Sequence, residues 1–422
     1  IVCSLVGSEM CIRDRISQQL NDRITRVGPN TQAGAVLRCY WHPAALVEEV
    51  ESQLPIPVNL LGERLALIPN RSGDLRLVTR ISAVGEPAVF YPDATEIKIE
   101  VKGPTYPVLI KKGIVFAYLG DGNAPEFPNF DCFRADDTHV FAFKGLWECN
   151  WLQALEIGID PAHASFLHRF LKDDDQGSNY GKQFRDKVAQ TSMPMTQVLR
   201  EYPRPDINVE ETDYGLKITA LRHMEHGQTH VRITNQIFPE AICIPMSREM
   251  TITQWHVPID DENCYWFTLF TSFKEPVNKE LMRAQRLKEH ELPTYAPVKN
   301  RRNSYGYDPQ EQADETYTGM GMDINVHDQW AVEGMGRIQN RTREHLGRSD
   351  KAIIRYRRIL RQAIDAMGAG NRNALPMQDG EKIKTIIGPL SNDAVAPTEN
   401  WSGASHQADL ERRAGCPWDA SV

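Results

Sequence analysis

The most informative stretch of this sequence is NWLQALEIGIDPAHASFLH, which runs from Asn150 to His168. It carries His163 and His168, and neutral imidazole is a good ligand for Fe(II), Zn(II) and Cu(II). Five positions along a regular helix correspond to a rotation of about 140°, so the two histidines would lie on different faces. We therefore predict an irregularity between them, either a break near Pro161 or a π-type widening of the helix.

Asp160 lies three residues before His163. At this spacing its carboxylate could accept the second ring N–H of His163, which would fix the tautomer of a metal-ligating histidine. The alternative is that both histidines are surface or structural residues, because a short motif alone does not make a site. We interpret the other histidines as solvated loop residues (His223, His226, His230) or as structural ones (His42, His256, His345).

On either side of this stretch, apolar residues recur with the spacing of strands and helices. The predicted strands are Gly215–His223, His230–Phe238, Met250–Val257 and Tyr265–Phe273. The predicted helices are Glu148–Lys172, Glu275–Glu291, Asp328–Leu346 and Lys351–Met367, and the segment Tyr305–Gly321 is predicted to be a loop. This order of elements predicts an α+β fold in which helices pack on an antiparallel sheet, in a helix-grip-like arrangement.

A smaller β-rich region precedes this sheet. Val58–Arg80 reads as two strands around the turn NRSGD, and further strand-like runs cover Ile97–Val101 and Tyr106–Leu119. Residues 1–15 resemble translated adapter sequence and are interpreted as non-native. The predicted domains are therefore a β domain over residues 16–125, a larger domain over 126–368, and a polar tail over 369–422, whose last thirty or so residues are predicted to be disordered or to wrap a neighbour.

Composition narrows the function classes. The 422 residues carry a net charge of −8 and no basic block, which argues against nucleic-acid binding. The eight cysteines lie far apart without a Cys-x-x-Cys pair, which favours reduced thiols in the cytoplasm over a disulfide framework. The sequence contains no run of about 18 apolar residues, so no membrane span is predicted.

Several stretches together resemble the large subunits of Rieske non-heme iron oxygenases, in the branch of phthalate 4,5-dioxygenase and phenoxybenzoate dioxygenase. The Asn150–His168 stretch looks like the iron-binding helix of that family. The other matching stretches are RITRVGPNTQAGAVLRCYWHPAAL (Arg23–Leu46), VKGPTYPVLIKKGIVFAYLG (Val101–Gly120), QWHVPIDDENCYWF and HDQWAVEGMGRIQNRTREHLGRSDKAIIRYRRIL (His327–Leu360). The resemblance implies a Rieske-like β domain followed by a catalytic domain with an antiparallel sheet.

Position by position, the resemblance implies that His163 and His168 are ligands of a mononuclear Fe(II) ion, with Asp328 as the third ligand. Asp160 matches the aspartate that links the iron to the Rieske cluster of an adjacent subunit, and Asn150 and Gln153 would lie near the iron. Two other carboxylates, Asp323 and Glu333, remain alternatives for the third ligand.

The resemblance also implies a [2Fe–2S] cluster held by Cys-x-His and Cys-x-x-His pairs. No cysteine in the chain has histidine two positions later, and the single Cys-x-x-His, Cys39 and His42, precedes all the predicted strands of the β domain. We interpret that pair as a coincidence, so no residue is identified as a cluster ligand. The ligand-bearing block is missing at a junction near Thr79–Glu86, through either a sequence fault or a natural loss.

For an intact relative, the resemblance implies oxidation of an aromatic, often carboxylated, substrate with O₂. Electrons would come from an NADH-dependent flavin or iron–sulfur reductase, and transfer between subunits implies a homotrimer. Arg222 and Arg232 are conceivable partners of a substrate carboxylate, and a surface role is an alternative. Two other classes remain open: a non-catalytic iron-binding or assembly subunit, and a hydrolytic zinc enzyme with the same ligands.

Overall fold

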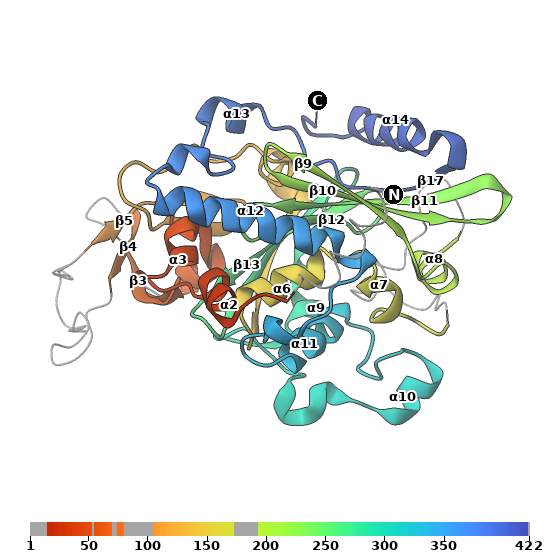
Figure 1. Ribbon diagram of the computed structural model, residues 1–422, viewed down its shortest axis with the longest axis horizontal. Helices are drawn as coiled ribbons and strands as arrows, with labels where there is room; N and C mark the ends of the chain where they lie inside the picture. The colour runs from red at the N-terminus through yellow and green to blue at the C-terminus, as the bar shows by residue number, and fades with distance from the viewer. Residues whose placement is uncertain (1–14, 53–54, 70–73, 80–103, 173–192, 421–422) are drawn as a thin grey trace.

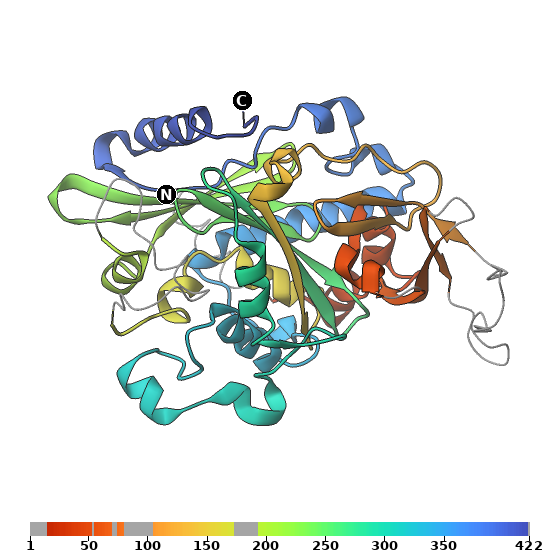
Figure 2. The same ribbon diagram turned by 180° about the vertical axis from the view of Figure 1, so that it is seen from behind.

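The computed structural model describes residues 15–52, 55–69, 74–79, 104–172 and 193–420. It has the predicted α+β architecture, with one large antiparallel sheet, smaller sheets and surrounding helices. The N-terminal elements, coloured red to orange, lie at one end of the molecule in both views (Figures 1 and 2). Among the described residues, none of the helices is long and apolar enough to cross a membrane.

The large sheet is antiparallel throughout and forms the centre of the molecule. In spatial order its strands are β8 (Val140–Trp147), β14 (Cys264–Ser272), β13 (Met250–Pro258), β12 (Ala241–Pro245), β11 (Gln228–Ile237), β10 (Gly215–His223) and β9 (Asp206–Thr212). A further strand, β17 (Asn392–Pro397), pairs with the first part of β11, whereas β12 pairs with its last three residues. The four predicted strands correspond to β10, β11, β13 and β14 and are confirmed.

Four strands of this sheet were not predicted, β8, β9, β12 and β17, and the first three have a weak sequence signal. β9 reads DINVEET and is largely exposed at the edge of the sheet, so charged residues mask its alternation. β12 has only five residues. β8 reads VFAFKGLW and is buried at nearly every position, which removes the period-two pattern.

Helices pack on this sheet and carry much of its core. α6 (Trp151–Gly158) packs on β12 and β13, and α12 (Lys351–Gly368) packs on β9 and β10. Figure 1 shows α12 lying across these strands. α11 (Ile324–Gly334) contacts α6. α6 buries the apolar residues Trp151, Leu152, Ala154 and Leu155 completely, and it also buries two polar side chains, Gln153 and Glu156.

The other α-helices described have between four and fourteen residues. They are α2 (Gln18–Thr25), α3 (Gln32–Leu37), α4 (Val47–Ser52), α5 (Asp131–Arg134), α7 (His163–Phe166), α8 (Met195–Glu201), α9 (Lys279–Arg286), α10 (Pro309–Asp314), α13 (Gly380–Thr385) and α14 (Trp401–Ala414).

Three predicted elements differ from the structure. The helix predicted from Glu275 begins only at Lys279, where Asn278 caps it, and residues His290–Glu291 form β15, which pairs with β16 (Ala296–Pro297). The helix predicted from Asp328 begins at Ile324 and ends at Gly334, because Asp323 caps its start. The predicted loop after Tyr305 contains α10, whose N-cap is Asp308.

The N-terminal region contains two small sheets. One consists of β1 (Trp41–Leu46), β7 (Ile114–Tyr118) and β6 (Val108–Lys111), and the other of β2 (Ile56–Leu60), β3 (Glu63–Pro69), β4 (Leu75–Thr79) and β5 (Thr105–Tyr106). The predicted junction begins at the last residue of β4, and its remainder lies outside the described residues, as do residues 1–14 and the predicted strand over residues 97–101.

The interpretation of His42 as structural agrees with its contacts. Its Nδ1 lies 2.6 Å from Glu240 Oε1, and its Nε2 lies 2.7 Å from the Leu37 carbonyl oxygen. The Cys39 thiol donates instead to the Ala35 carbonyl oxygen. Both ring nitrogens of His42 are therefore engaged, and neither side chain is turned to a shared cluster.

Disorder, one of the two alternatives predicted for the last thirty or so residues, is wrong for their described part. β17 pairs with β11 along six residues, and α14 packs on β17 and β11 along the upper edge of the view (Figure 1). The polar composition concealed this because the buried residues are small or paired: Ala394 and Ala396 are about 1% exposed, and the Asp393 carboxylate is bound by His230 and Arg232.

A buried ion cluster joins α6 to the C-terminal helices. The Glu156 carboxylate lies 2.7 Å from Arg341 Nη2 and 2.5 Å from Arg357 Nε. Arg357 also pairs with Glu344, and Arg341 donates to the Asn21 side chain of α2. Although burial opposes ionisation, the two guanidinium groups hold the pKa of Glu156 below its usual value. This carboxylate therefore fixes α6 against three other parts of the chain.

We expect Glu156→Gln to lower the free energy of unfolding by about 3 to 5 kcal/mol, because it leaves two buried guanidinium groups with too little negative charge. Urea denaturation followed by circular dichroism measures this change. Glu225→Gln is the matched control: its side chain is 82% exposed, so the substitution should change stability by less than about 0.5 kcal/mol. A loss at Glu156 no larger than at Glu225 would contradict the role of the cluster.

Candidate metal centre

The two histidines are brought together by the predicted break in the helix. α6 ends at Gly158, and α7 starts only at His163. The residues between them carry Pro161, whose ring cannot continue the hydrogen-bond ladder of a helix. α7 is a single turn, and His168 follows directly after it. The break thus replaces the rotation of a continuous helix and turns both imidazoles toward α11.

Asp328, on α11, completes a three-residue group with these histidines. Its Oδ1 lies 3.2 Å from His168 Nε2 and 3.7 Å from His163 Nε2. One ligand atom from each of the three residues lies within 4.8 Å of the other two. The two imidazole centroids are 5.0 Å apart, and the rings are nearly perpendicular at 83°.

The electrostatics of this group suit a divalent cation. Burial lowers the pKa of His163 and lowers that of His168 to about 3, so both imidazoles are neutral at pH 7. Burial also raises the pKa of Asp328 to about 6, which leaves its carboxylate anionic at pH 7. Asp328 Oδ1 is buried and has no hydrogen-bond partner among the described residues. An unsatisfied buried oxygen that faces two imidazole nitrogens is a position that a metal ion would satisfy.

His327 fixes the tautomer of His168. Its Nε2 lies 2.8 Å from the Gly321 carbonyl oxygen, which can only accept, so we assign the His327 proton to Nε2. His327 Nδ1 then accepts from His168 Nδ1, 3.4 Å away. The lone pair of His168 therefore lies on Nε2, opposite the Asp328 oxygen. Sequence reasoning missed His327, although it is the residue directly before Asp328.

The contact predicted between Asp160 and His163 is only partly correct. His163 Nδ1 donates to the backbone carbonyl oxygen of Asp160 and not to its carboxylate. The carboxylate accepts the backbone N–H of Ala162 at 2.8 Å. Either acceptor orients the imidazole in the same way and leaves Nε2 for a metal. The carboxylate of Asp160 is consequently not needed to orient His163.

The two alternative third ligands are engaged elsewhere. Asp323 caps α11 and pairs with the buried Arg286 at 2.8 Å. Glu333 accepts from the backbone N–H of Glu148 and from the Tyr305 hydroxyl. Neither carboxylate belongs to the group that His163 and His168 form with Asp328.

Asn150 and Gln153 were predicted to lie near the iron, and their contacts are structural instead. Asn150 caps α6 and donates to the carbonyl oxygens of Thr25 and Asp261. Gln153 donates to the carbonyl oxygens of Val332 and Gly336. Its amide therefore ties α6 to the end of α11, which sets the distance between the two helices that position the group.

Arg222, on β10, holds the break from the opposite side. Its Nη2 donates to the Pro161 carbonyl oxygen at 3.1 Å and to Ser165 Oγ at 3.0 Å. The side chain is buried, which corrects the surface role considered from sequence, and its Nε and Nη1 have no partner among the described residues. Arg222 thus connects Pro161, which lies in the break, to Ser165, which lies in the single turn of α7.

The second group of histidines divides into two environments. His226 is 92% exposed and His223 is half-exposed, in agreement with the predicted solvated loop. His230 is instead fully buried, and its Nε2 lies 2.9 Å from Asp393 Oδ1. The same carboxylate binds Arg232 at 2.5 Å. The interpretation of His230 as solvated is therefore wrong, because β17 covers it with a buried carboxylate.

The comparisons with known proteins agree with this architecture. A family model described as LigXa C-terminal domain like matches residues 117–402. The chain is 26% identical to the 5,5'-dehydrodivanillate O-demethylase oxygenase subunit of a Sphingobium species, over 90% of this chain and 88% of that protein. It is also 26% identical to the phthalate 4,5-dioxygenase oxygenase subunit of Pseudomonas putida, over 84% of this chain and 88% of that protein.

Among solved structures, the chain is similar to the terminal oxygenase of carbazole 1,9a-dioxygenase from Nocardioides aromaticivorans IC177. The TM-score is 0.47 at 15% identity, with 83% of this chain and 100% of that chain covered.

The alignment with the Sphingobium protein contains internal gaps. It runs over 427 positions, more than the 422 residues of this chain, although it covers only 90% of them. Several dozen positions of that relative therefore have no counterpart in this chain.

We expect His327→Phe to weaken metal binding about tenfold to a hundredfold, because it removes the acceptor that fixes the His168 tautomer. Competition between the protein and a chelator for Co(II) or Fe(II) measures this affinity. His226→Phe, at an exposed position, is the control and should bind metal as the parent does. Equal affinity in His327→Phe and the parent would show that the tautomer is fixed in another way.

Proposed function

This chain belongs to the Rieske non-heme iron oxygenases, in the family described as LigXa C-terminal domain like, and we propose that it activates O₂ at one Fe(II) ion held by His163, His168 and Asp328. The observation that carries the proposal is the buried group of two neutral imidazoles and one carboxylate whose Oδ1 has no other partner. Two histidines and one carboxylate are the ligand set of non-heme Fe(II) oxygenases, which leave positions open for O₂.

In this proposal the protein supplies orientation and shape, and the bound Fe(II) supplies the activation of O₂. The Asp160 carbonyl orients His163, and His327 orients His168. The amide of Gln153 and the guanidinium of Arg222 hold the elements that carry these ligands. Both imidazoles are thus oriented by hydrogen bonds, which favours a fixed ligand geometry.

We further propose a carboxylated aromatic substrate. The names of two relatives refer to dehydrodivanillate and phthalate. Arg232 lies on the sheet close enough to His168 for its positive charge to help lower the pKa of that imidazole, after the larger effect of burial. It is also partly exposed, and one of its nitrogens is committed to Asp393. A guanidinium can bind a carboxylate through two parallel N–H groups, so Arg232 could hold a substrate acid beside the metal.

The supply of electrons is the unusual part of this proposal. The family uses a Rieske cluster, but the chain contains no Cys-x-His pair, and its Cys39–His42 pair is engaged elsewhere. Electrons would then come directly from a reduced partner, such as an NADH-dependent flavin or iron–sulfur reductase. We retain the homotrimer, with Asp160 at the subunit boundary, as part of the proposal.

The absence of the cluster ligands also favours a second candidate function. A chain that binds iron but receives no electrons would be a non-catalytic iron-binding or assembly subunit. The oxygenase and the non-catalytic subunit require the same metal ligands, so only a measurement of enzymatic turnover distinguishes them.

We expect the parent protein to bind one iron per chain, and His163→Ala and His168→Ala to lose it, because each variant removes one of three ligands. Elemental analysis after anaerobic loading with Fe(II) and desalting measures the metal content. His223→Ala is the control and should retain iron. Stoichiometric iron in either ligand variant would overturn the assignment, and a preference for zinc in the parent would favour the hydrolytic alternative.

We expect the Fe(II)-loaded chain to consume O₂ when a carboxylated aromatic compound and an external reductant are both supplied. The expected product is hydroxylated or demethylated, and the rate should be negligible without the aromatic compound and in His168→Ala. An oxygen electrode and product analysis measure the reaction. Stoichiometric iron without substrate-dependent O₂ consumption would favour the non-catalytic subunit.

A further inference from the structure

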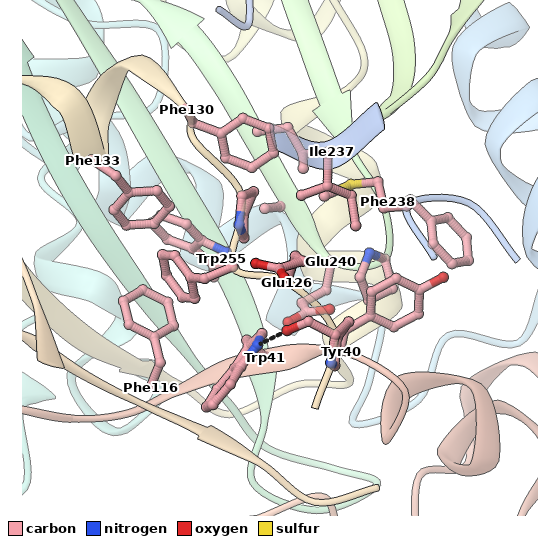
Figure 3. A pocket seen from close by; sticks show the side chains of 17 residues that line it. Tyr40, Trp41, Phe116, Glu126, Phe130, Phe133, Ile237, Phe238, Glu240 and Trp255 are labelled. Carbon is pink, nitrogen blue, oxygen red and sulfur yellow. Dashed lines mark hydrogen bonds between the residues drawn. The ribbon is translucent and has the colours of Figure 1, made fainter. Parts of the chain in front are cut away.

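A second hollow lies at the junction between the N-terminal region and the large sheet, apart from the metal centre. Its walls come from the segment before β1, from β7, from the residues that precede β8, and from β11 to β13 (Figure 3). Residues around α13 contribute the remaining wall. It contains about 500 Å³ of space between atoms, part of which is open to solvent.

Most of the wall is aromatic. Eight rings contribute, and Figure 3 shows those of Tyr40, Trp41, Phe116, Phe130, Phe133, Phe238 and Trp255 around the space. The polar atoms of two of these rings are already used. Tyr40 donates its hydroxyl to the Pro376 carbonyl oxygen, and Trp41 donates its indole N–H to the Pro125 carbonyl oxygen. The rings therefore offer a ligand their faces and edges but leave few hydrogen-bonding groups.

Glu240 and Glu126 are the charged residues of the wall, and both are labelled near the middle of Figure 3. Glu240 is 1% exposed, and its Oε2 has no hydrogen-bond partner among the described residues. Glu126 is half-exposed and lies 3.4 Å from the exposed Lys384. No lysine, arginine or histidine belongs to the described wall. The hollow thus combines two carboxylates with the negative faces of aromatic rings.

Glu240 shares one of its carboxylate oxygens with His42. Its Oε1 and the Leu37 carbonyl oxygen face the two ring nitrogens of His42, and both acceptors are satisfied when the imidazole is protonated. Burial opposes that charge, but the carboxylate of Glu240 raises the pKa of His42 above its usual value. His42 therefore occupies Oε1 of Glu240, while Oε2 has no hydrogen-bond partner among the described residues.

We propose that this hollow is a binding site for a small organic ammonium ion. The N–H groups of such a ligand would donate to Glu240 Oε2, and its carbon atoms would contact the aromatic rings. Cations are stabilised over aromatic faces, and buried carboxylates form their strongest hydrogen bonds with charged donors. An anionic aromatic acid of the kind proposed for the metal centre would be repelled by both carboxylates. The proposed ligand therefore differs from the substrate proposed for the metal centre, and its binding does not depend on the proposed oxygenase reaction.

The test is a titration of the full chain, labelled with fluorotryptophan, followed by fluorine NMR. Trp41 and Trp255 report on the hollow, and a Trp255→Phe variant assigns one of the signals. We expect methylammonium to shift these signals saturably. Methanol and acetate, which have similar size but lack positive charge, should shift them at least tenfold less effectively. Methanol or acetate that binds as tightly as methylammonium would overturn the proposal, and so would the absence of saturable binding, which an ordered water on Glu240 would explain.

Charge variants provide the second arm of the test. Glu240→Gln should weaken methylammonium binding about tenfold, because a neutral amide replaces a charged acceptor. Since that variant also disturbs His42, Glu126→Gln serves as an independent one and should weaken binding about twofold from its exposed position. Glu381→Gln is the matched control: it also lies beside Lys384, at 3.3 Å, but is not part of the wall. Binding that none of the three substitutions changes, or that Glu381→Gln weakens as much as Glu126→Gln, would contradict the site.

Discussion

The interruption between α6 and α7 is the constraint on which the metal centre depends. A continuous helix would place His163 and His168 on different faces. The break brings the two histidines together only if the chain is held in place on both sides of it. The structure provides both restraints. Glu156 and Gln153 fix α6 to the C-terminal helices, while Arg222 reaches from β10 to the break and to α7. The geometry of the group is therefore a consequence of tertiary contacts and not of helix periodicity.

Much of this arrangement could be predicted from the sequence, because the determining signals are local. The alternation of apolar residues located four strands of the sheet, and Pro161 located the break. What could not be predicted depends on residues far apart in the chain. His327 reads as an ordinary helix residue until α11 is placed beside α7, and His230 reads as solvated until β17 covers it.

The third ligand illustrates the same distinction. Asp323, Asp328 and Glu333 lie within one helical segment, and the sequence offers each of them as a carboxylate. The structure separates them by their partners, since Asp323 is occupied by Arg286 and Glu333 by the Glu148 backbone and Tyr305. Asp328 alone among these three is left with a buried oxygen lacking a hydrogen-bond partner. A buried polar atom without a hydrogen-bond partner thus indicates a candidate metal ligand. The position of a carboxylate in the sequence does not give this information.

The scaffold of the metal centre is also separable from the segment that bears the expected cluster ligands. β2 to β5 contact mainly one another and, outside their own sheet, β1 and β6, and the predicted junction begins where β4 ends. The elements that position His163, His168 and Asp328 are tied instead to one another and to the large sheet. Loss of a block beyond β4 would therefore remove the electron donor without removing a contact described at the metal group.

The N-terminal region has a structural role even without a cluster, because it forms part of the wall of the aromatic hollow. His42, on β1, contacts the buried Glu240, which follows β11. This buried pair therefore joins the N-terminal region to the large sheet. The same pair leaves one carboxylate oxygen of Glu240, a residue of the wall of the hollow, without a hydrogen-bond partner, whereas the partly exposed guanidinium of Arg232 lies on the sheet near His168. The ligands proposed for the hollow and for the surroundings of the metal centre therefore carry opposite charges. Each would be disfavoured by its charge at the other place, so the two proposals can be tested independently.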